Sequence, residues 1–578
     1  MKNFIKMSHL VLTITLIFIA IACDSSYRQV KVDAENKKKH ELISDNFMIT
    51  TQGEGTSAAG LEIIKAGGNI IDAAVAVSFA ISVERPHSTG IGGGGFLIYY
   101  DAKTKKSHVY DFREMAPLKS HKKYFVDAEG KQIKDKSLTG GFAAGTPGLV
   151  RGLAKIHKDL GKMDWDKTVQ PAIKLARNGF KVYPALHNAM SAERDRLLKF
   201  TDSKEIFLNK AGEPWPIGHV LVQEDLAKTL ETIAQTYGED FYTGDIAKKI
   251  VASIQEQKAD MSMQDLAGYE VKKRDAIKGS YKGYEIISMP PPSSGGTHIV
   301  QILNILEDYD LKSMGVQNPK TIHLTSAAMQ LAFRDRQRYM GDSDFVDVPL
   351  KTLTSKDYAA RLRKLIKKNK ALSFEELKTP SPLGKEPEHT THFSLMDKEG
   401  NIVVSTQTIN GWFGSALVAE GTGIVMNNEM DDFAASASGV NLFGALGGEN
   451  NLVEARKRPL SSMSPSIVIK DGKPVLALGT PSGTRILTCV AQTILNYIEH
   501  ELPLWEAVAA TRYHHQWYPD EIRVDPPYFY TNTKKELQAM GYKINEKGFG
   551  CSIQAIANEN GKLHGVSDMR GYGQAVGF

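Results

Sequence analysis

The sequence predicts a layered α/β fold, in which helices cover β-sheets, and three observations support this prediction. Short runs of β-branched and aromatic residues alternate with longer apolar stretches along the chain. Glycine, proline and Asp-Gly pairs separate these runs at turn positions. Of the 578 residues, 42% are hydrophobic and 24% are charged, as in ordinary soluble globular proteins. Because strands alternate with helices in both halves, a layered fold is favoured over an all-β sandwich.

The first half of the chain begins with two predicted helices and a hairpin. Thr56 can cap a helix that runs to Ala66, where Gly67 and Gly68 end it. The alanine-rich apolar run that follows is typical of a fully buried helix. We expect order to begin near Met48, with a buried helix over 70–83, hairpin strands over 96–100 and 108–112, and mainly helices over 147–266.

The second half contributes further strands on either side of a linker. We predict a strand over 284–288, a helix over 298–306, a strand over 402–409 and a hairpin over 466–478 that turns at Asp471-Gly472. Residues 379–387 are rich in proline and cannot form a core helix or a central strand. The linker therefore divides the chain into a larger helix-rich part and a smaller strand-rich part.

The N-terminal residues are typical of an export signal. Lys2 and Lys6 precede an apolar stretch, Leu10 to Ala22, that is shorter than the roughly 20 residues needed to span a bilayer. Its end resembles a bacterial lipoprotein processing site at Cys23, although the usual leucine three positions earlier is absent. We predict a signal over 1–23, a flexible polar tether over 24–46 and a periplasmic protein. The protein is then either lipid-anchored through Cys23 or cleaved nearby as an ordinary signal sequence.

Cysteine content excludes a disulfide framework. After Cys23, only Cys489 and Cys551 remain, which is too few for an exported protein built on disulfides. One bridge between these two residues is compatible with the sequence, and so are two free thiols. No second apolar segment is long enough to span a membrane.

Charge and motifs exclude several classes of function. A formal net charge of +5 over this length is weak support for a nucleic-acid or membrane partner. No serine-hydrolase elbow, zinc-protease motif or Walker loop occurs. Glycines 92–95 precede a strand, so close backbone packing is favoured over phosphate binding. The adjacent pair His514 and His515 lacks the spacing of metal ligands. We predict neither a metal nor a cofactor.

Thr390, directly behind the linker, is the strongest candidate for chemistry. The pair Thr390 and Thr391 at the start of a strand would ordinarily reflect β propensity alone. A threonine hydroxyl needs an activating base, however. The α-amine of a chain that begins at threonine supplies one, with a pKa of about 8. Cleavage between His389 and Thr390 would create this amine, and a loose linker would let the new ends separate.

Six separate segments resemble those of γ-glutamyltransferases, in the same order along the chain. The similarity runs collinearly from about Phe47 to near the C-terminus, so chance is a poor explanation. These enzymes are N-terminal nucleophile hydrolases, and the resemblance implies their four-layer αββα sandwich. It also implies self-cleavage into a large subunit, 47–389, and a small catalytic subunit, 390–578, that remain associated. The segments are 51–55, 111–117, 290–296, 390–394, 427–433 and 458–465.

By this resemblance, Thr390 both cuts the chain and acts as the nucleophile of the mature enzyme. Its hydroxyl attacks the carbonyl of His389 to form an ester that water opens, and the freed amine then serves as general base. Thr408 orients the nucleophile through its hydroxyl, although outside this motif it would be an ordinary strand threonine. Backbone N–H groups around Ser482 and Gly483, at a helix start, form an oxyanion hole.

The resemblance also implies two clamps for the γ-glutamyl head group. An arginine with two serines binds the α-carboxylate, a task for which the planar guanidinium suits better than lysine. An asparagine and two carboxylates accept hydrogen bonds from the α-ammonium group. Carboxylate clusters also occur in glycosidases and metal sites, but nothing else in the chain supports either. The residues are Arg113, Ser461 and Ser462 for the carboxylate, and Asn410, Glu429 and Asp432 for the ammonium group.

Two departures from the family pattern affect this predicted site. The family usually has two glycines where this chain has Ser482 and Gly483, so the details of the oxyanion hole are open although its backbone donors remain. In the predicted lid, 438–450, Phe443 stands where bacterial relatives often have a tyrosine whose hydroxyl latches the lid. We therefore expect a lid that closes less firmly and tolerates more leaving groups or acceptors.

The expected function is transfer of a γ-glutamyl group through an ester on Thr390. Donors would be glutathione and related γ-glutamyl compounds, and acceptors would be water, amino acids or dipeptides; Asp432 goes with transfer beyond hydrolysis. The first alternative is a relative with changed specificity, such as a cephalosporin acylase or a capsule polyglutamate-processing enzyme. Retention of Arg113, both serines and Asp432 argues against an acylase. The second alternative is a lipid-anchored amino-acid-binding protein, which would remain a single chain.

Overall fold

A computed structural model describes residues 34–133, 135–377, 390–436 and 440–578 of the chain. The predicted export signal, the proline-rich linker and the first residues of the predicted lid lie outside these ranges, and so do residues 24–33 of the predicted tether. The chain divides into a unit Met1–Lys38 and a unit Lys39–Phe578. The description below concerns the second unit. No helix of the described residues is long and apolar enough to cross a membrane.

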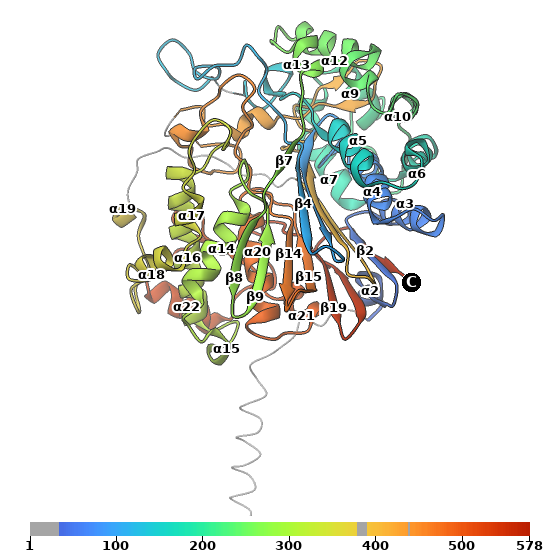
Figure 1. Ribbon diagram of the computed structural model, residues 1–578. Coiled ribbons are helices and arrows are strands. Elements are labelled where there is room, and N and C mark those ends of the chain that lie inside the picture. The colour runs from blue at the N-terminus through green and yellow to red at the C-terminus, as the bar shows by residue number, and fades with distance from the viewer. Residues whose placement is uncertain (1–33, 134, 378–389, 437–439) are drawn as a thin grey trace, which may run out of the picture. The chain divides into compact units, whose positions relative to one another are not determined.

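Two antiparallel sheets, each of seven strands among the described residues, pack face to face. Figure 1 shows both sheets nearly edge-on at the centre of this unit. The first sheet runs β21 (Gln574–Gly577), β2 (Phe47–Thr51), β10 (Thr391–Asp397), β11 (Ile402–Thr408), β3 (Gly94–Asp101), β4 (Lys106–Asp111) and β7 (Lys272–Arg274). The second runs β1 (Glu41–Ser44), β20 (Lys562–Ser567), β19 (Gln554–Glu559), β15 (Lys473–Gly479), β14 (Ser466–Lys470), β9 (Tyr284–Ser288) and β8 (Ile277–Tyr281).

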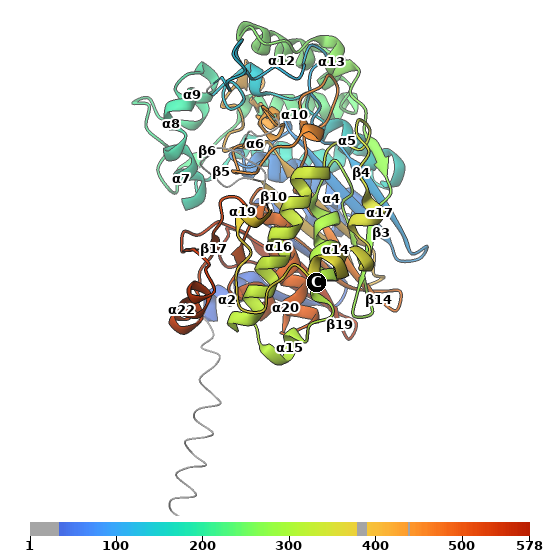
Figure 2. The ribbon, with the colours of Figure 1, turned by 90° about the vertical axis from the view of Figure 1, so that its left-hand side faces the viewer.

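Helices cover the outer face of each sheet (Figures 1 and 2). The order of layers is therefore helices, sheet, sheet, helices, which confirms the predicted αββα sandwich. The first sheet is covered by α3 (Glu54–Lys65), α4 (Ile70–Glu84) and α5 (Leu149–Leu160), with α6 (Trp165–Asn178) and α10 (Glu224–Thr236) outside them. The second is covered by α14 (Gly295–Leu306), α20 (Arg485–Ile498) and α21 (Leu504–Ala509), with α16 (Pro319–Tyr339) packed against α14.

Shorter elements surround this core. The helical ones are α7 (Pro184–Ala192), α8 (Arg194–Leu197), α9 (Thr201–Phe207), α11 (Asp240–Thr243), α12 (Asp245–Glu256), α13 (Met263–Ala267), α15 (Leu311–Met314), α17 (Leu350–Leu353), α18 (Lys356–Arg363), α19 (Phe374–Leu377), α22 (Thr531–Ala539), η1 (Gly141–Ala143), η2 (Glu429–Asp432) and η3 (Glu449–Asn451). Helix α2 (Ala34–His40) spans the boundary between the two units. The strands are β5 (Phe180–Lys181), β6 (Val220–Leu221), β12 (Val418–Ala419), β13 (Ile424–Val425), β16 (Tyr513–His514), β17 (Ile522–Val524) and β18 (Ile544–Asn545).

Helix α4 is buried along its whole length, as its composition predicts. All its residues are buried because the first sheet, α3, α5 and α6 surround it. Its start is fixed by Asn69, whose side chain accepts hydrogen bonds from the N–H groups of Ile71 and Asp72, while the Asp72 carboxylate accepts from the Asn69 N–H. This reciprocal capping satisfies donors that a buried helix end cannot leave to water.

Two expectations for the N-terminal region are wrong. Helix α3 begins at Glu54, so Thr56 lies inside the helix and does not cap it. The Thr56 hydroxyl instead donates a 2.6 Å hydrogen bond to the buried carboxylate of Glu84, at the end of α4. Order also begins before Met48, because β1 pairs along β20, with Glu41 opposite Val566. Residues 41–44 therefore belong to the second sheet and not to a flexible tether.

The hairpin of β14 and β15 carries the loop that approaches Thr390. Its turn residues Asp471 and Gly472 both have positive φ, 52° and 72°, as a two-residue hairpin loop requires. Strand β15 then leads through residues 480–484 into α20. A disulfide joins Cys489 in α20 to Cys551, just before β19. The sequence is compatible with this disulfide and with two free thiols, and the structure shows that the disulfide forms.

Candidate active site

Thr390 and Thr408 lie opposite each other at the ends of two neighbouring strands. The register places Thr391 of β10 across from Gln407 of β11, so the next pair outward is Thr390 and Thr408. The Thr390 hydroxyl donates a 3.3 Å hydrogen bond to the Thr408 hydroxyl, which also accepts from the N–H of Asn410 at 2.8 Å. Thr390 is only 4% exposed and has a φ of 131°, which is rare for a β-branched residue.

The glycine run before β3 supports the end of β11. A β-carbon on Gly93 would lie 2.1 Å from the Thr408 carbonyl oxygen, and one on Gly92 would lie 2.3 Å from the Val425 carbonyl oxygen. Both distances are far below van der Waals contact, so only glycine permits this approach. The predicted close backbone packing is present, and it positions the strand end that carries Thr408.

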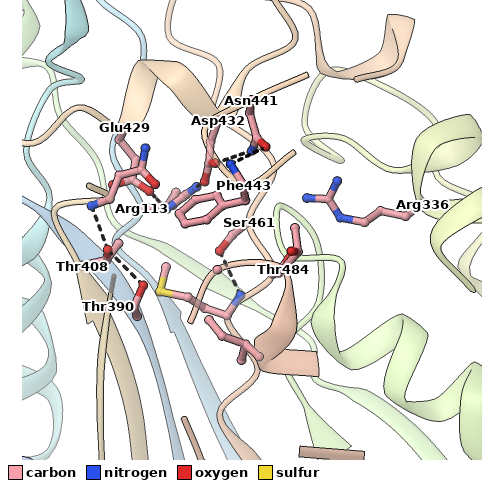
Figure 3. A pocket seen from close by; sticks show the side chains of 15 residues that line it. Arg113, Arg336, Thr390, Thr408, Glu429, Asp432, Asn441, Phe443, Ser461 and Thr484 are labelled. Atoms are coloured by element: carbon pink, nitrogen blue, oxygen red, sulfur yellow. Dashed lines mark hydrogen bonds and ion pairs between the residues drawn. The ribbon is translucent and has the colours of Figure 1, made fainter. Parts of the chain in front are cut away.

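Arg113 follows β4 and extends into the same cavity as Thr390 (Figure 3). Its guanidinium is bound by two carboxylates from η2: one nitrogen contacts Glu429 and the other lies 2.6 Å from Asp432. Its Nε donates to the Pro459 carbonyl at 3.2 Å, next to the segment with the two serines. The structure therefore brings the predicted anion clamp and cation clamp into direct contact with each other.

This buried cluster contains more carboxylates than Arg113 can neutralise. Glu114 lies 3.9 Å from Arg113, and neither of its oxygens has a hydrogen-bond partner among the described residues. Burial raises the pKa of Glu114 to about 7, against the attraction of Arg113. Burial also raises the pKa of Glu429. Burial opposes the charge on Arg113 as well, but Glu429, Asp432 and Glu114 outweigh this effect and raise its pKa, so Arg113 stays charged.

Ser461 and Ser462 also line the cavity. The Ser461 carbonyl accepts 2.9 Å hydrogen bonds from both the N–H and the hydroxyl of Ser294, which precedes α14. The Ser294 hydroxyl lies 3.5 Å from that of Ser462 and accepts from Nε of Arg336 at 3.1 Å. Arg336 comes from α16 and lines the cavity; no sequence motif had marked it.

The loop between β15 and α20 has the backbone geometry expected of two glycines. Ser482 has a φ of 111° and Gly483 a φ of 54°, and the first value is unusual for a residue with a side chain. The Ser482 hydroxyl donates to the Phe549 carbonyl, an interaction that glycine cannot make. Gly483 and Thr484 line the cavity together with Thr390.

The segment predicted to be a lid contacts η2 and Gln516, through interactions that sequence reasoning missed. The Asn441 side chain donates to Asp432 at 2.9 Å, and the Leu442 N–H donates to Asp431 at 2.6 Å. Gln516 donates to the Phe443 carbonyl at 3.1 Å. Phe443 is buried and faces the cavity, as Figure 3 shows. Asp431 and Asp432 lie within the recognised segment 427–433, but only the fold shows that they reach the lid.

Thr390 separates two cavities. The first, which contains Arg113 and the serines, has a free volume of about 20 Å³, little more than one water molecule occupies. The second, of about 230 Å³, lies on the other side of Thr390 and Ser482. Basic and aromatic side chains line it, among them Arg85, Trp412, Arg570 and Tyr572. An amino-acid head group can fill the first cavity only after Arg113, its carboxylates or the lid move.

Comparison with known proteins identifies the family. The sequence model of one family, described as gamma-glutamyltranspeptidase, matches residues 56–578. The chain belongs to the γ-glutamyltranspeptidase family. A family relative from Escherichia coli (strain K12), named glutathione hydrolase proenzyme, is 42% identical over 542 residues, which cover 94% of this chain and 93% of the relative. The Acylase ACY 1 proenzyme of Pseudomonas sp. (strain SE83) is 35% identical, covering 92% and 93%.

Solved structures agree with this family and fold. A cephalosporin acylase from Bacillus halodurans superposes with a TM-score of 0.83 at 27% identity and covers 96% of this chain and 98% of that chain. A chain of the γ-glutamyltranspeptidase from Helicobacter pylori is 41% identical, with a TM-score of 0.55, and covers 56% of this chain and 93% of that chain. Proteins similar to this chain are thus named for different substrates, and the side chains of the site must distinguish between these substrates.

Proposed function

We propose that this chain is a precursor that cuts itself before Thr390 and then transfers γ-glutamyl groups from glutathione and related compounds. The observation that carries the proposal is the placement of the Thr390 hydroxyl. It is hydrogen-bonded to Thr408 in the wall of a cavity that also holds a buried arginine and two carboxylates. An α-amino acid head group needs both charges, because its carboxylate and its ammonium group must each lose water on entry.

In the self-cleavage step, the Thr390 oxygen attacks the carbonyl carbon of His389 and the peptide C–N bond breaks. The proton from the hydroxyl passes to the departing amine, and the resulting ester is opened by water. The φ of 131° at Thr390 supports this step, since a strained backbone conformation raises the ground-state energy of the bond to be cut. The products are a large subunit, 47–389, and a small catalytic subunit, 390–578, that stay together.

In the transfer step, the freed amine of Thr390 takes the proton of its hydroxyl as the oxygen attacks the γ-carbonyl carbon. Thr408 orients this oxygen, and backbone N–H groups of the Ser482-Gly483 loop stabilise the negative charge that develops on the carbonyl oxygen. The amine then protonates the leaving amine, and an ester on Thr390 remains. Water or an acceptor amine attacks the ester and releases the γ-glutamyl product.

The clamps act on the head group of the donor. Its ammonium group replaces Arg113 as the partner of Glu429 and Asp432, assisted by the carbonyl of the Asn410 side chain. Arg113 then binds the α-carboxylate together with Ser461 and Ser462. The existing ion pairs support this assignment because they already place opposite charges within one hydrogen bond of each other.

The second cavity is the place for the leaving group and for the acceptor. It adjoins Thr390 on the side away from Arg113, and its arginines suit the carboxylate of an amino acid or dipeptide. A cephalosporin acylase is the alternative function, supported by the structural likeness to the Bacillus halodurans enzyme. Glu429 and Asp432 favour the γ-glutamyl donor, since an acyl group without an ammonium group has no cation with which to replace Arg113 beside these two carboxylates. Export, with lipidation at Cys23, remains part of the proposal.

Intact mass spectrometry beside a Thr390→Ala variant tests the precursor. We expect two fragments that meet at His389-Thr390 in the parent and one uncut chain in the variant. The parent should then release p-nitroaniline from γ-glutamyl-p-nitroanilide, and faster when glycylglycine is present as acceptor. An uncut parent would remove the proposed nucleophile. A cut parent that cleaves glutaryl-p-nitroanilide but not its γ-glutamyl counterpart would favour the acylase.

A further inference from the structure

Arg336 is a buried cation without a carboxylate partner. It is 5% exposed, and no acidic side chain among the described residues lies within 4 Å of its nitrogens. Its one side-chain hydrogen bond in this part of the chain runs from Nε to the neutral Ser294 hydroxyl. Arg113, across the same cavity, contacts three carboxylates. Burying an unpaired charge costs free energy, and a bound anion would offset this cost, so Arg336 is a candidate anion-binding residue.

The free end of Arg336 faces the cavity that holds Thr390. Figure 3 shows the guanidinium projecting from the side of α16, toward Phe443 and Ser461, while Arg113 lies on the far side. Burial lowers the pKa of Arg336 to about 10, with Asp432 opposing and Arg113 adding to this effect. The side chain therefore remains charged at neutral pH and presents donors to the cavity.

Ser294 connects Arg336 to the predicted carboxylate-binding serines. Its hydroxyl accepts from Arg336, donates to the Ser461 carbonyl and lies 3.5 Å from the Ser462 hydroxyl. An anion held by Ser462 would therefore lie next to Arg336. Arg113 and Arg336 both line the cavity together with the serines. Their environments differ, because Arg113 is paired with carboxylates and Arg336 is not.

We propose that Arg336 is a second binding residue for the α-carboxylate of the γ-glutamyl head group, which it takes together with Arg113 and Ser462. This inference rests on the proposed function. It explains how a carboxylate can enter while Arg113 is still bound to Glu429 and Asp432. Arg336 attracts the carboxylate first, and the ammonium group of the same molecule then displaces Arg113 from its carboxylates. Substrates without an α-carboxylate would gain nothing from Arg336.

Two p-nitroanilides test this role in the processed enzyme. γ-Glutamyl-p-nitroanilide carries the α-carboxylate, and 4-aminobutyryl-p-nitroanilide lacks only that group. Arg336→Met should raise KM and lower kcat/KM for the first substrate by about 10- to 100-fold, the loss expected of a charge-assisted hydrogen bond. On the second substrate, assayed with enough enzyme to give a measurable rate, kcat/KM should change by less than about threefold on the same reasoning. Arg336→Lys should restore part of the selectivity.

Arg338→Met is the matched control. Arg338 lies on the same helix but is exposed and donates to the Leu377 carbonyl, away from the cavity. The substitution should leave kcat/KM unchanged for both substrates. If Arg336→Met lowered kcat/KM by the same factor for both substrates, the proposal would be overturned, because a purely structural role through Ser294 predicts that result. If Arg336→Met does not process itself, the selectivity ratio of Arg336→Lys decides. A processed parent that does not cleave γ-glutamyl-p-nitroanilide would overturn the proposed function itself.

Discussion

The ring of Phe443 occupies the space that a β-carbon on Gly483 would need. Such an atom would lie 2.3 Å from the Phe443 ring, well inside van der Waals contact. Gly483 also has a φ of 54°, which a residue with a side chain adopts only at a cost. The predicted lid and the loop proposed to hold the oxyanion are therefore packed together, so a substitution in one should shift the position of the other.

Gly483→Ala should impair catalysis more than stability. The added methyl group must push away either Phe443 or the loop, and loss of one oxyanion donor lowers kcat by about 100-fold or more. Gly472→Ala is the control, because Gly472 also has a positive φ, 72°, but lies in the remote turn of the β14–β15 hairpin. Both variants should unfold at somewhat lower temperature, and only Gly483→Ala should lose activity. Equal kcat values in the two would exclude the packing argument.

Phe443→Tyr should narrow the range of acceptors. A hydroxyl at this position could latch the lid, which phenylalanine holds by packing alone. We expect rates with different amino acids and dipeptides to spread more widely in the variant than in the parent. The measurement is the initial transfer rate for each acceptor with a common γ-glutamyl donor. Identical acceptor profiles would mean that the phenylalanine has no influence on lid closure.

Thr408→Val should slow both self-cleavage and turnover. Valine keeps the shape of threonine but removes the hydroxyl that Thr390 and the Asn410 N–H contact. We expect a loss of roughly 10- to 100-fold in each rate, in line with one misplaced nucleophile contact. Thr406→Val, on the same face of β11, removes a hydroxyl that bonds to His392 instead. It should lower stability without a selective effect on cleavage, which gel densitometry over time would reveal.

Asp431 should make stability depend on pH between about 4 and 7. Burial raises its pKa from 3.8 to about 7, despite hydrogen bonds from Ser137 and the Leu442 N–H. The folded protein then binds more protons than the unfolded chain in this range. The contribution of Asp431 to the free energy of unfolding is thus fully present below pH 3.8 and lost as pH rises through 7. Asp431→Asn should show a smaller decline in urea midpoint over this range.

The Cys489–Cys551 bridge should stabilise the fold substantially. The two cysteines are 62 residues apart in sequence, and a loop of this size corresponds to about 4 kcal/mol of unfolding free energy in the chain-entropy description. The double variant Cys489→Ala/Cys551→Ala should therefore unfold at lower urea concentration. Dithiothreitol should lower the midpoint of the parent and leave the variant unchanged. A reductant effect of equal size on both proteins would argue against the bridge.

Elements fixed by local patterns were predictable from the sequence. Strand β9 has the predicted bounds, α4 has the predicted buried character, and the β14–β15 turn follows from Asp471-Gly472. Elements that depend on distant partners were not. The Thr56 hydroxyl is captured by Glu84, and β1 forms only because β20 pairs with it from the other end of the chain. Neither partner can be inferred from nearby residues.

The same distinction applies to the candidate site. The resemblance named residues from separate segments, and the fold brings Arg113, Glu429, Asp432, Thr390 and Thr408 around one cavity. Their roles remain predictions. Arg336 escaped notice because no motif surrounds it in the sequence, and only the fold of α16 against α14 places it in the cavity wall. The contacts of Asn441 and Leu442 depend equally on how the lid folds over η2.

The strand order within the sheets has a consequence for the protein once it is cut. Both sheets contain strands from before Thr390 and strands from after it, and these strands pair with each other. Strand β2 lies between β21 and β10, β11 pairs with β3, and β14 pairs with β9. Pulling the two polypeptides apart would break ladders within both sheets, and neither piece would keep a complete core. The two chains should therefore unfold together in one cooperative transition, and because unfolding releases two separate polypeptides, the melting temperature should rise with protein concentration.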